Sequence, residues 1–331
     1  MKKVISLVLS LIIICSLFAM PTKAATTIED YYTTYGSYGV SSATIDCSEE
    51  NFSCYNIYYP TDLSAKAQFP AIIFCNGTGV TSATYGALLK HFASWGYIVF
   101  GNNCTSTGNG ASTHKTLEYL ISENSNSASK FYNKIDLDRL AVVGHSQGGA
   151  GTMNACSTGK YKNAYMFKTL VSVNGVQASL AAFQGAGYDA KQIKCPAFLI
   201  GADDDLDAGA TGLCPLETGL IANMNNIQSS NVIIGQMKNT DHTTALINSR
   251  GYIIAWLNYI LLNDPTAESV FKDGGEIYTN SNWQNVTKKA TSSTTPADPS
   301  EPSNSNASLF SRIMEIIFTF WNLIFKIFGA K

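Results

Sequence analysis

The sequence predicts one α/β domain in which a mainly parallel sheet is covered by helices on both faces. Short apolar runs of strand length alternate with segments of helical pattern, which is typical of parallel sheets with crossover helices. A glycine-rich turn also joins one of these runs directly to the helical segment that follows it. The predicted strands are 71–74, 97–100, 140–143, 170–173, 197–200 and 232–234, and the predicted helices are 85–95, 116–122, 147–156 and 252–262.

The first 24 residues have the pattern of a secretory signal peptide. Lys2 and Lys3 precede an apolar run from 4 to 20, and small residues lie near Ala24. We therefore expect a secreted or cell-surface protein, with an uncleaved anchor as the alternative. Loss of Lys2, Lys3 and Lys23 with the leader lowers the formal charge from −2 to −5. No basic cluster remains for nucleic acid, so a nucleic-acid partner is not expected.

Seven of the eight cysteines lie beyond this leader, and export would place them where disulfides persist. Cys47 and Cys54 flank a short polar turn between two strand-like segments, so the sequence predicts a disulfide across a hairpin. No cysteine spacing matches a zinc site, and no metal is predicted. The remaining five are Cys75 and Cys104 after two buried strands, Cys195 and Cys214 around a later acidic loop, and Cys156, expected to be a free thiol.

The glycine-rich turn has the sequence of a nucleophile elbow. Residues 144–148 read GHSQG directly after the apolar run 140–143, and a helical segment follows. In G-x-S-x-G the serine occupies a sharp strand-to-helix turn that exposes its hydroxyl, and side chains at the glycine positions would clash. Ser146 is therefore the predicted nucleophile, with Gly144 and Gly148 as the elbow glycines. The structural alternative is a glycine-rich turn with a surface serine.

A serine nucleophile needs a base, which is usually histidine, later in the chain. Only His242 lies downstream of Ser146, on the segment after the strand-like run 232–234. His145 precedes the serine and should point away from its hydroxyl into a packed layer. His91 and His114 lie in helical stretches and are interpreted as structural residues.

The acid that orients the base should follow the strand at 196–201, where the chain is rich in aspartate. The spacing strand-Gly-x-x-Asp selects Asp204, and Asp203 and Asp205 are the alternatives. Asp203, Asp205 and Asp207 also alternate as in a calcium loop. However, positions 208 and 214 hold alanine and cysteine, where such a loop needs glycine and glutamate, so calcium is the weaker interpretation.

Two backbone amides should stabilise the negative oxygen that forms during acyl transfer. One belongs to Gln147, the residue after the nucleophile. The other should come from the loop after an earlier strand, and the sequence Cys-Asn-Gly-Thr-Gly at 75–79 makes Thr78 the predicted donor.

These segments resemble the bacterial cutinases and poly(ethylene terephthalate) hydrolases of the dienelactone-hydrolase-like group. GHSQGGAGT at 144–152 is similar to their elbow, Tyr-Tyr-Pro-Thr at 58–61 to the segment before their third strand, and 255–264 to their closing helix. The resemblance covers about 38–264. It implies an α/β-hydrolase fold, a Ser146–Asp204–His242 triad, an oxyanion hole at Thr78 and Gln147, and no cofactor.

Two departures concern substrate size. The family usually has an aromatic residue where Thr78 stands, and a tryptophan in the region that here reads Val-Asn-Gly-Val at 173–176. Those aromatic rings stack against bulky acyl groups. Their absence predicts a smaller or more polar ester than an aromatic polyester.

The catalytic domain is predicted to span 30–287. A linker rich in Ser, Thr, Pro and Asn follows at 288–308, and then an amphipathic helix at 309–331 whose polar residues recur every three or four positions. This helix is predicted to bind a membrane surface or a protein partner, and docking onto the catalytic domain is the alternative.

The function predicted from the sequence is hydrolysis of carboxylic esters by an exported, cutinase-like serine esterase that favours short acyl chains. The alternatives are a lipase, an esterase that removes acyl groups from polysaccharides, and a surface interaction protein on a hydrolase scaffold.

Overall fold

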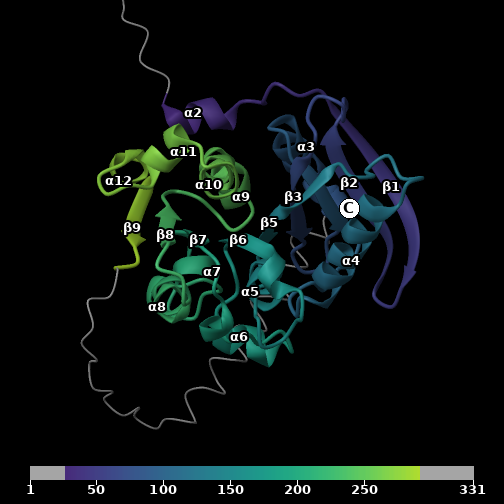
Figure 1. The fold of residues 1–331 in the computed structure, drawn as a ribbon. Helices are drawn as coiled ribbons and strands as arrows, with labels where there is room; N and C mark the ends of the chain where they lie inside the picture. The colour runs from purple at the N-terminus through teal and green to yellow at the C-terminus, as the bar shows by residue number, and fades with distance from the viewer. Residues whose placement is uncertain (1–26, 291–331) are drawn as a thin grey trace, which may run out of the picture.

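The computed structural model describes residues 27–290 (Figure 1). Within this range one sheet has the strand order β1-β2-β4-β3-β5-β6-β7-β8-β9. The predicted signal peptide (1–24), most of the linker (288–308) and the C-terminal helix (309–331) lie outside the described residues and stay predictions. The strands are β1 Val40–Glu49, β2 Phe52–Pro60, β3 Phe69–Cys75, β4 Ile98–Asn102, β5 Ile135–His145, β6 Phe167–Val173, β7 Ala197–Ala202, β8 Val232–Met237 and β9 Trp283–Lys288.

The central strands are parallel, as predicted. From β4 through β3, β5, β6 and β7 to β8, each strand pairs in parallel with its neighbour. The pairs β1–β2, β2–β4 and β8–β9 at the two edges are antiparallel. The six predicted strands all fall in this parallel part, and the α/β class is confirmed.

Helices cover both faces of the sheet (Figure 1). The helices α3, α10 and α11 lie on one face, and α4, α5 and α8 lie on the other. The helices are α2 Ile28–Thr33, α3 Gly86–Ser94, α4 Ala111–Ser125, α5 Gln147–Ala155, α6 Ala178–Phe183, α7 Asp205–Ala208, α8 Ala222–Asn226, α9 Ala245–Asn248, α10 Arg250–Leu262, α11 Pro265–Val270 and α12 Glu276–Thr279. Within the described range, no helix is both long and apolar enough to cross a membrane.

Each strand contributes to two apolar layers because successive side chains of a strand point to opposite faces. In β3, Ile72 and Phe74 pack with α3 and α10, whereas Ala71 and Ile73 pack with α4 on the other face. Both faces of the central strands are therefore apolar and buried, which explains their continuous apolar runs in the sequence. The sheet fixes the carboxyl ends of β3, β5, β7 and β8. The predicted site residues lie on the segments that follow these four strand ends.

The predicted Cys47–Cys54 disulfide is not present in the structure. All seven cysteines of the described range are free thiols. The register pairs Cys54 with Asp46, and Cys47 is the next residue of β1. Side chains at adjacent strand positions leave toward opposite faces, so the hairpin does not align the two sulfurs. Cys156 and Cys195 approach to 3.7 Å, which still exceeds a disulfide bond length of about 2.05 Å.

Candidate active site

The predicted elbow has the backbone that its sequence requires. The strand β5 ends at His145, the helix α5 begins at Gln147, and Ser146 between them has φ 60° and ψ −125°. A positive φ is costly for a residue with a side chain. Hydrogen bonds hold it there: the Ser146 amide donates to the Val173 carbonyl at 2.9 Å, and the Ser146 carbonyl accepts from the Gly149 amide at 2.8 Å.

Glycine is required on both sides of Ser146. A Cβ at Gly144 would collide with the Gly148 carbonyl, and a Cβ at Gly148 would collide with the Cys75 carbonyl at the end of β3. Because neither position has a side chain, the backbone of α5 can approach the ends of β5 and β3 closely. The two elbow glycines are thus explained by close backbone approach.

His242 lies beside the elbow on the loop after β8. Its ring centroid is 4.8 Å from that of His145, the residue before Ser146. Its Nδ1 lies 2.8 and 3.0 Å from the two carboxylate oxygens of Asp207. Asp207 is fully buried and His242 is 6% exposed, so water competes little for this hydrogen bond. The arrangement fixes the imidazole so that its Nε2 is left for another partner.

Asp207, and not the predicted Asp204, is the carboxylate that contacts Nδ1 of His242. The spacing argument counts residues from the end of β7, but the chain after β7 forms a helical turn, α7, that begins at Asp205. Asp204 is the N-cap of that turn, and its carboxylate accepts from the Asp207 amide at 3.2 Å. Asp203 instead accepts from the Thr240 amide at 3.1 Å. Of the three carboxylates that resemble a calcium loop, Asp203 and Asp207 therefore have separate partners.

The electrostatics of the pair follow from its burial. Burial lowers the pKa of His242 to about 4, which keeps the imidazole neutral near pH 7. Burial also raises the pKa of the Asp207 carboxyl. The imidazole N–H that Asp207 accepts favours the carboxylate, and this attraction strengthens when His242 takes up a proton. A neutral histidine with an available Nε2 is suited to general base catalysis.

The other three histidines hydrogen-bond to backbone carbonyls. His91 in α3 hydrogen-bonds through Nε2 to the Thr34 carbonyl, and His114 in α4 does so to the Ala155 carbonyl. His145 is buried, and its Nε2 lies 2.7 Å from the carbonyl oxygen of His242.

The predicted oxyanion loop lies against the elbow. A Cβ built on Gly77 would lie 3.5 Å from the Ser146 Cβ, so Gly77 is in contact with the nucleophile. Thr78 is the next residue of this loop. The side chain of Asn76 fixes the loop by donating to the carbonyls of Asn102 and Cys104. The Thr78 amide has no acceptor among the described residues. Gln147 opens α5, and first-turn amides lack intrahelical acceptors.

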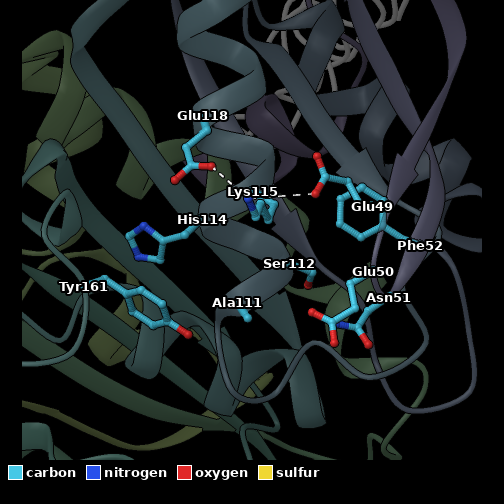
Figure 2. Close-up of a pocket in the computed structure, with 10 residues that line it drawn as sticks. All are labelled: Glu49, Glu50, Asn51, Phe52, Ala111, Ser112, His114, Lys115, Glu118 and Tyr161. Atoms are coloured by element: carbon cyan, nitrogen blue, oxygen red, sulfur yellow. Dashed lines mark ion pairs between the residues drawn. The ribbon is translucent and has the colours of Figure 1, made fainter.

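A separate pocket of about 220 Å³ lies between the β1–β2 turn and α4 (Figure 2). Lys115 Nζ lies 3.4 Å from Glu118 Oε2 and 4.0 Å from Glu49 Oε2. The ring of His114 stacks on that of Tyr161. The Lys115 and Glu118 side chains are more than half exposed, so their ion pair contributes little to stability. Neither Ser146, Asp207 nor His242 lines this pocket.

The fold and the elbow place the chain among the α/β hydrolases, in which the nucleophile lies at the carboxyl edge of a parallel sheet. A family model described as PET hydrolase-like matches residues 20–284. The chain therefore belongs to the PET hydrolase-like family, which confirms the predicted class of cutinase-like carboxylic ester hydrolases.

Three similar proteins support this family membership. A cutinase of Thermobifida alba is 25% identical over 224 residues, covering 65% of this chain and 67% of the cutinase. A cutinase of Thermobifida cellulosilytica is 26% identical over 68% of this chain and 82% of its own. A bis(hydroxyethyl) terephthalate hydrolase of Streptomyces coelicolor is 30% identical over 129 residues, which span 37% of this chain and only 40% of that protein.

Proposed function

We propose that this protein hydrolyses carboxylic esters through an acyl-enzyme on Ser146, with His242 as general base and Asp207 as its orienting acid. The observation that carries the proposal is the buried Asp207–His242 pair beside the strained elbow. A surface interaction protein would not need a positive φ at the serine or a buried carboxylate aimed at Nδ1.

The chemistry proceeds in two halves. His242 Nε2 takes the hydroxyl proton of Ser146 as Oγ attacks the ester carbonyl carbon, and the carbonyl electron pair moves onto its oxygen. When the tetrahedral species collapses, the alcohol leaves with the proton from His242, and the acyl group stays on Oγ. Water then repeats the sequence and releases the carboxylic acid. Asp207 stabilises the charged imidazole that forms in each half.

The Thr78 and Gln147 amides are the proposed donors to the tetrahedral oxyanion. Both come from segments held by the fold, the loop fixed by Asn76 and the first turn of α5. Donors held in place before reaction need little reorganisation, and loss of one typically costs about 10²–10³ in kcat.

The pH dependence of kcat/KM is expected to follow His242. The base is active only when neutral, so activity falls as pH drops through its pKa. Burial lowers that pKa below the ordinary 6.5, so the acid limb should have its midpoint below pH 6.5. Burial and nearby Asp207 raise the pKa of Asp204 to about 6, so Asp204→Asn tests whether this carboxyl causes the acid limb. The limb should persist in this variant, with its midpoint unchanged or lower, because the Asp204 charge raises the pKa of His242. A wild-type midpoint at or above 6.5 would contradict this assignment.

We further propose a preference for small acyl groups. Val176 is 3% exposed and packs with Leu180 and Leu213, so it offers no aromatic surface to a substrate, and Thr78 carries none. Trp95 is held against Tyr31 and Tyr32 instead.

A panel of p-nitrophenyl esters from acetate to palmitate tests the acyl preference. The expected result is highest kcat/KM for acetate or butyrate and little release of product from an aromatic polyester film. A maximum at palmitate would favour a lipase instead, and rapid film hydrolysis would contradict the argument from Thr78 and Val176.

A further inference from the structure

A chain of hydrogen bonds joins the oxyanion loop to the histidine loop behind Ser146. The Gly77 amide lies 3.1 Å from the Tyr85 hydroxyl, which lies 3.1 Å from His145 Nδ1. His145 Nε2 in turn lies 2.7 Å from the carbonyl oxygen of His242. Two side chains thus connect segments that follow β3 and β8.

The direction of every hydrogen bond in this chain is fixed by its ends. The Gly77 amide can only donate, so the Tyr85 oxygen accepts from it, and the His242 carbonyl can only accept, so His145 Nε2 carries a proton. A neutral His145 then accepts at Nδ1, and the Tyr85 hydroxyl supplies that proton. Burial and the proximity of His242 lower the pKa of His145 to about 3, which keeps it neutral.

The surroundings leave the two side chains little freedom. Tyr85 packs its ring on Phe74 with centroids 4.8 Å apart, and His145 is 6% exposed. The His242 carbonyl also accepts from the Asn174 side chain at 2.9 Å. Asn174 itself accepts from the Ala202 amide at the end of β7, so this second contact is anchored to the sheet.

We infer that Tyr85 and His145 are positioning residues that hold the Gly77–Thr78 loop and the His242 loop at a fixed distance from each other around Ser146. The inference rests on the proposed function. Gly77 precedes Thr78, the proposed oxyanion donor, and the His242 carbonyl belongs to the proposed base. One chain of contacts therefore sets the distance between the oxyanion donor and the base, which must act in the same step. Misplacement of such groups by about 1 Å can cost about 10²-fold in rate.

The test compares Tyr85→Phe and His145→Gln with matched controls elsewhere. Tyr161→Phe removes a hydroxyl that donates to the Asn109 carbonyl, and His91→Gln removes a buried imidazole bonded to the Thr34 carbonyl. With p-nitrophenyl butyrate we expect kcat to fall about 10- to 100-fold in the network variants, with KM within about two-fold of the original. Both controls should keep the original kcat.

A double variant separates a connected chain from two independent packing effects. Because Tyr85 and His145 act through the same contacts, the double variant should lose no more kcat than the more severe single variant. Additive losses, or a Tyr85→Phe variant with unchanged kcat, would overturn the inference. If His145→Gln does not fold, Tyr85→Phe alone decides, since it removes a single oxygen. Full activity of Ser146→Ala would instead refute the proposed function itself.

Discussion

Replacement of Ser146 by alanine is expected to abolish ester hydrolysis while the protein stays folded. Alanine removes only Oγ, and the elbow is held by backbone hydrogen bonds to Val173 and Gly149 that do not involve the side chain. Without Oγ no acyl-enzyme forms, and loss of a triad serine lowers kcat by about 10⁶. Steady-state hydrolysis of p-nitrophenyl acetate measures the effect.

Ser157→Ala is the matched control for this prediction. Ser157 is also buried, but it lies beyond the far end of α5, away from the elbow. This variant should keep its activity, and circular dichroism should show both variants folded. Residual activity of a few per cent in folded Ser146→Ala would mean that another group is the nucleophile.

Replacement of Asp207 by asparagine is expected to lower kcat by about 10⁴ with little loss of stability. The carboxylate of Asp207 accepts the Nδ1 proton of His242 at 2.8 Å, whereas an amide can donate there and stabilise the tautomer that carries its proton on Nε2. That tautomer cannot accept the serine proton. The substitution also replaces a fully buried carboxyl by a neutral group of similar shape, so the melting temperature should change little.

Asp204→Asn is the control for Asp207→Asn because the two residues are three positions apart on the same turn. Asparagine keeps an oxygen that can accept from the Asp207 amide, so the cap of α7 should survive. We expect a kcat close to the original. A severe loss in Asp204→Asn together with a mild one in Asp207→Asn would restore the sequence assignment and contradict the geometry.

Most of the fold was predictable because its signals are local. Apolar runs such as 140–143 are buried on both faces, and the glycines at 144 and 148 have steric causes that any sequence with this elbow shares. The strand β9 was missed because Trp283–Lys288 is an antiparallel edge strand with a polar, alternating sequence. Edge strands need less apolar sequence than central ones.

The acid was misassigned because its position depends on a short helix. Counting from the end of β7 selects Asp204, but one helical turn, α7, brings Asp207 to His242 instead. The sequence held a signal for that turn: an aspartate followed three residues later by another acidic residue is typical of a helix start. The contacts of Tyr85 with Gly77 and His145 join three separate segments and could not be found without the structure.

Identification of the acylated residue tests the central claim most directly. The protein is mixed with p-nitrophenyl acetate, quenched in acid within the first turnover, and mapped by peptide mass spectrometry. An acyl-enzyme mechanism predicts one acetyl group on Ser146, strongly reduced in Asp207→Asn and unchanged in Asp204→Asn. Product release without any acetyl on Ser146, or an acetyl that forms equally in Asp207→Asn, would contradict it.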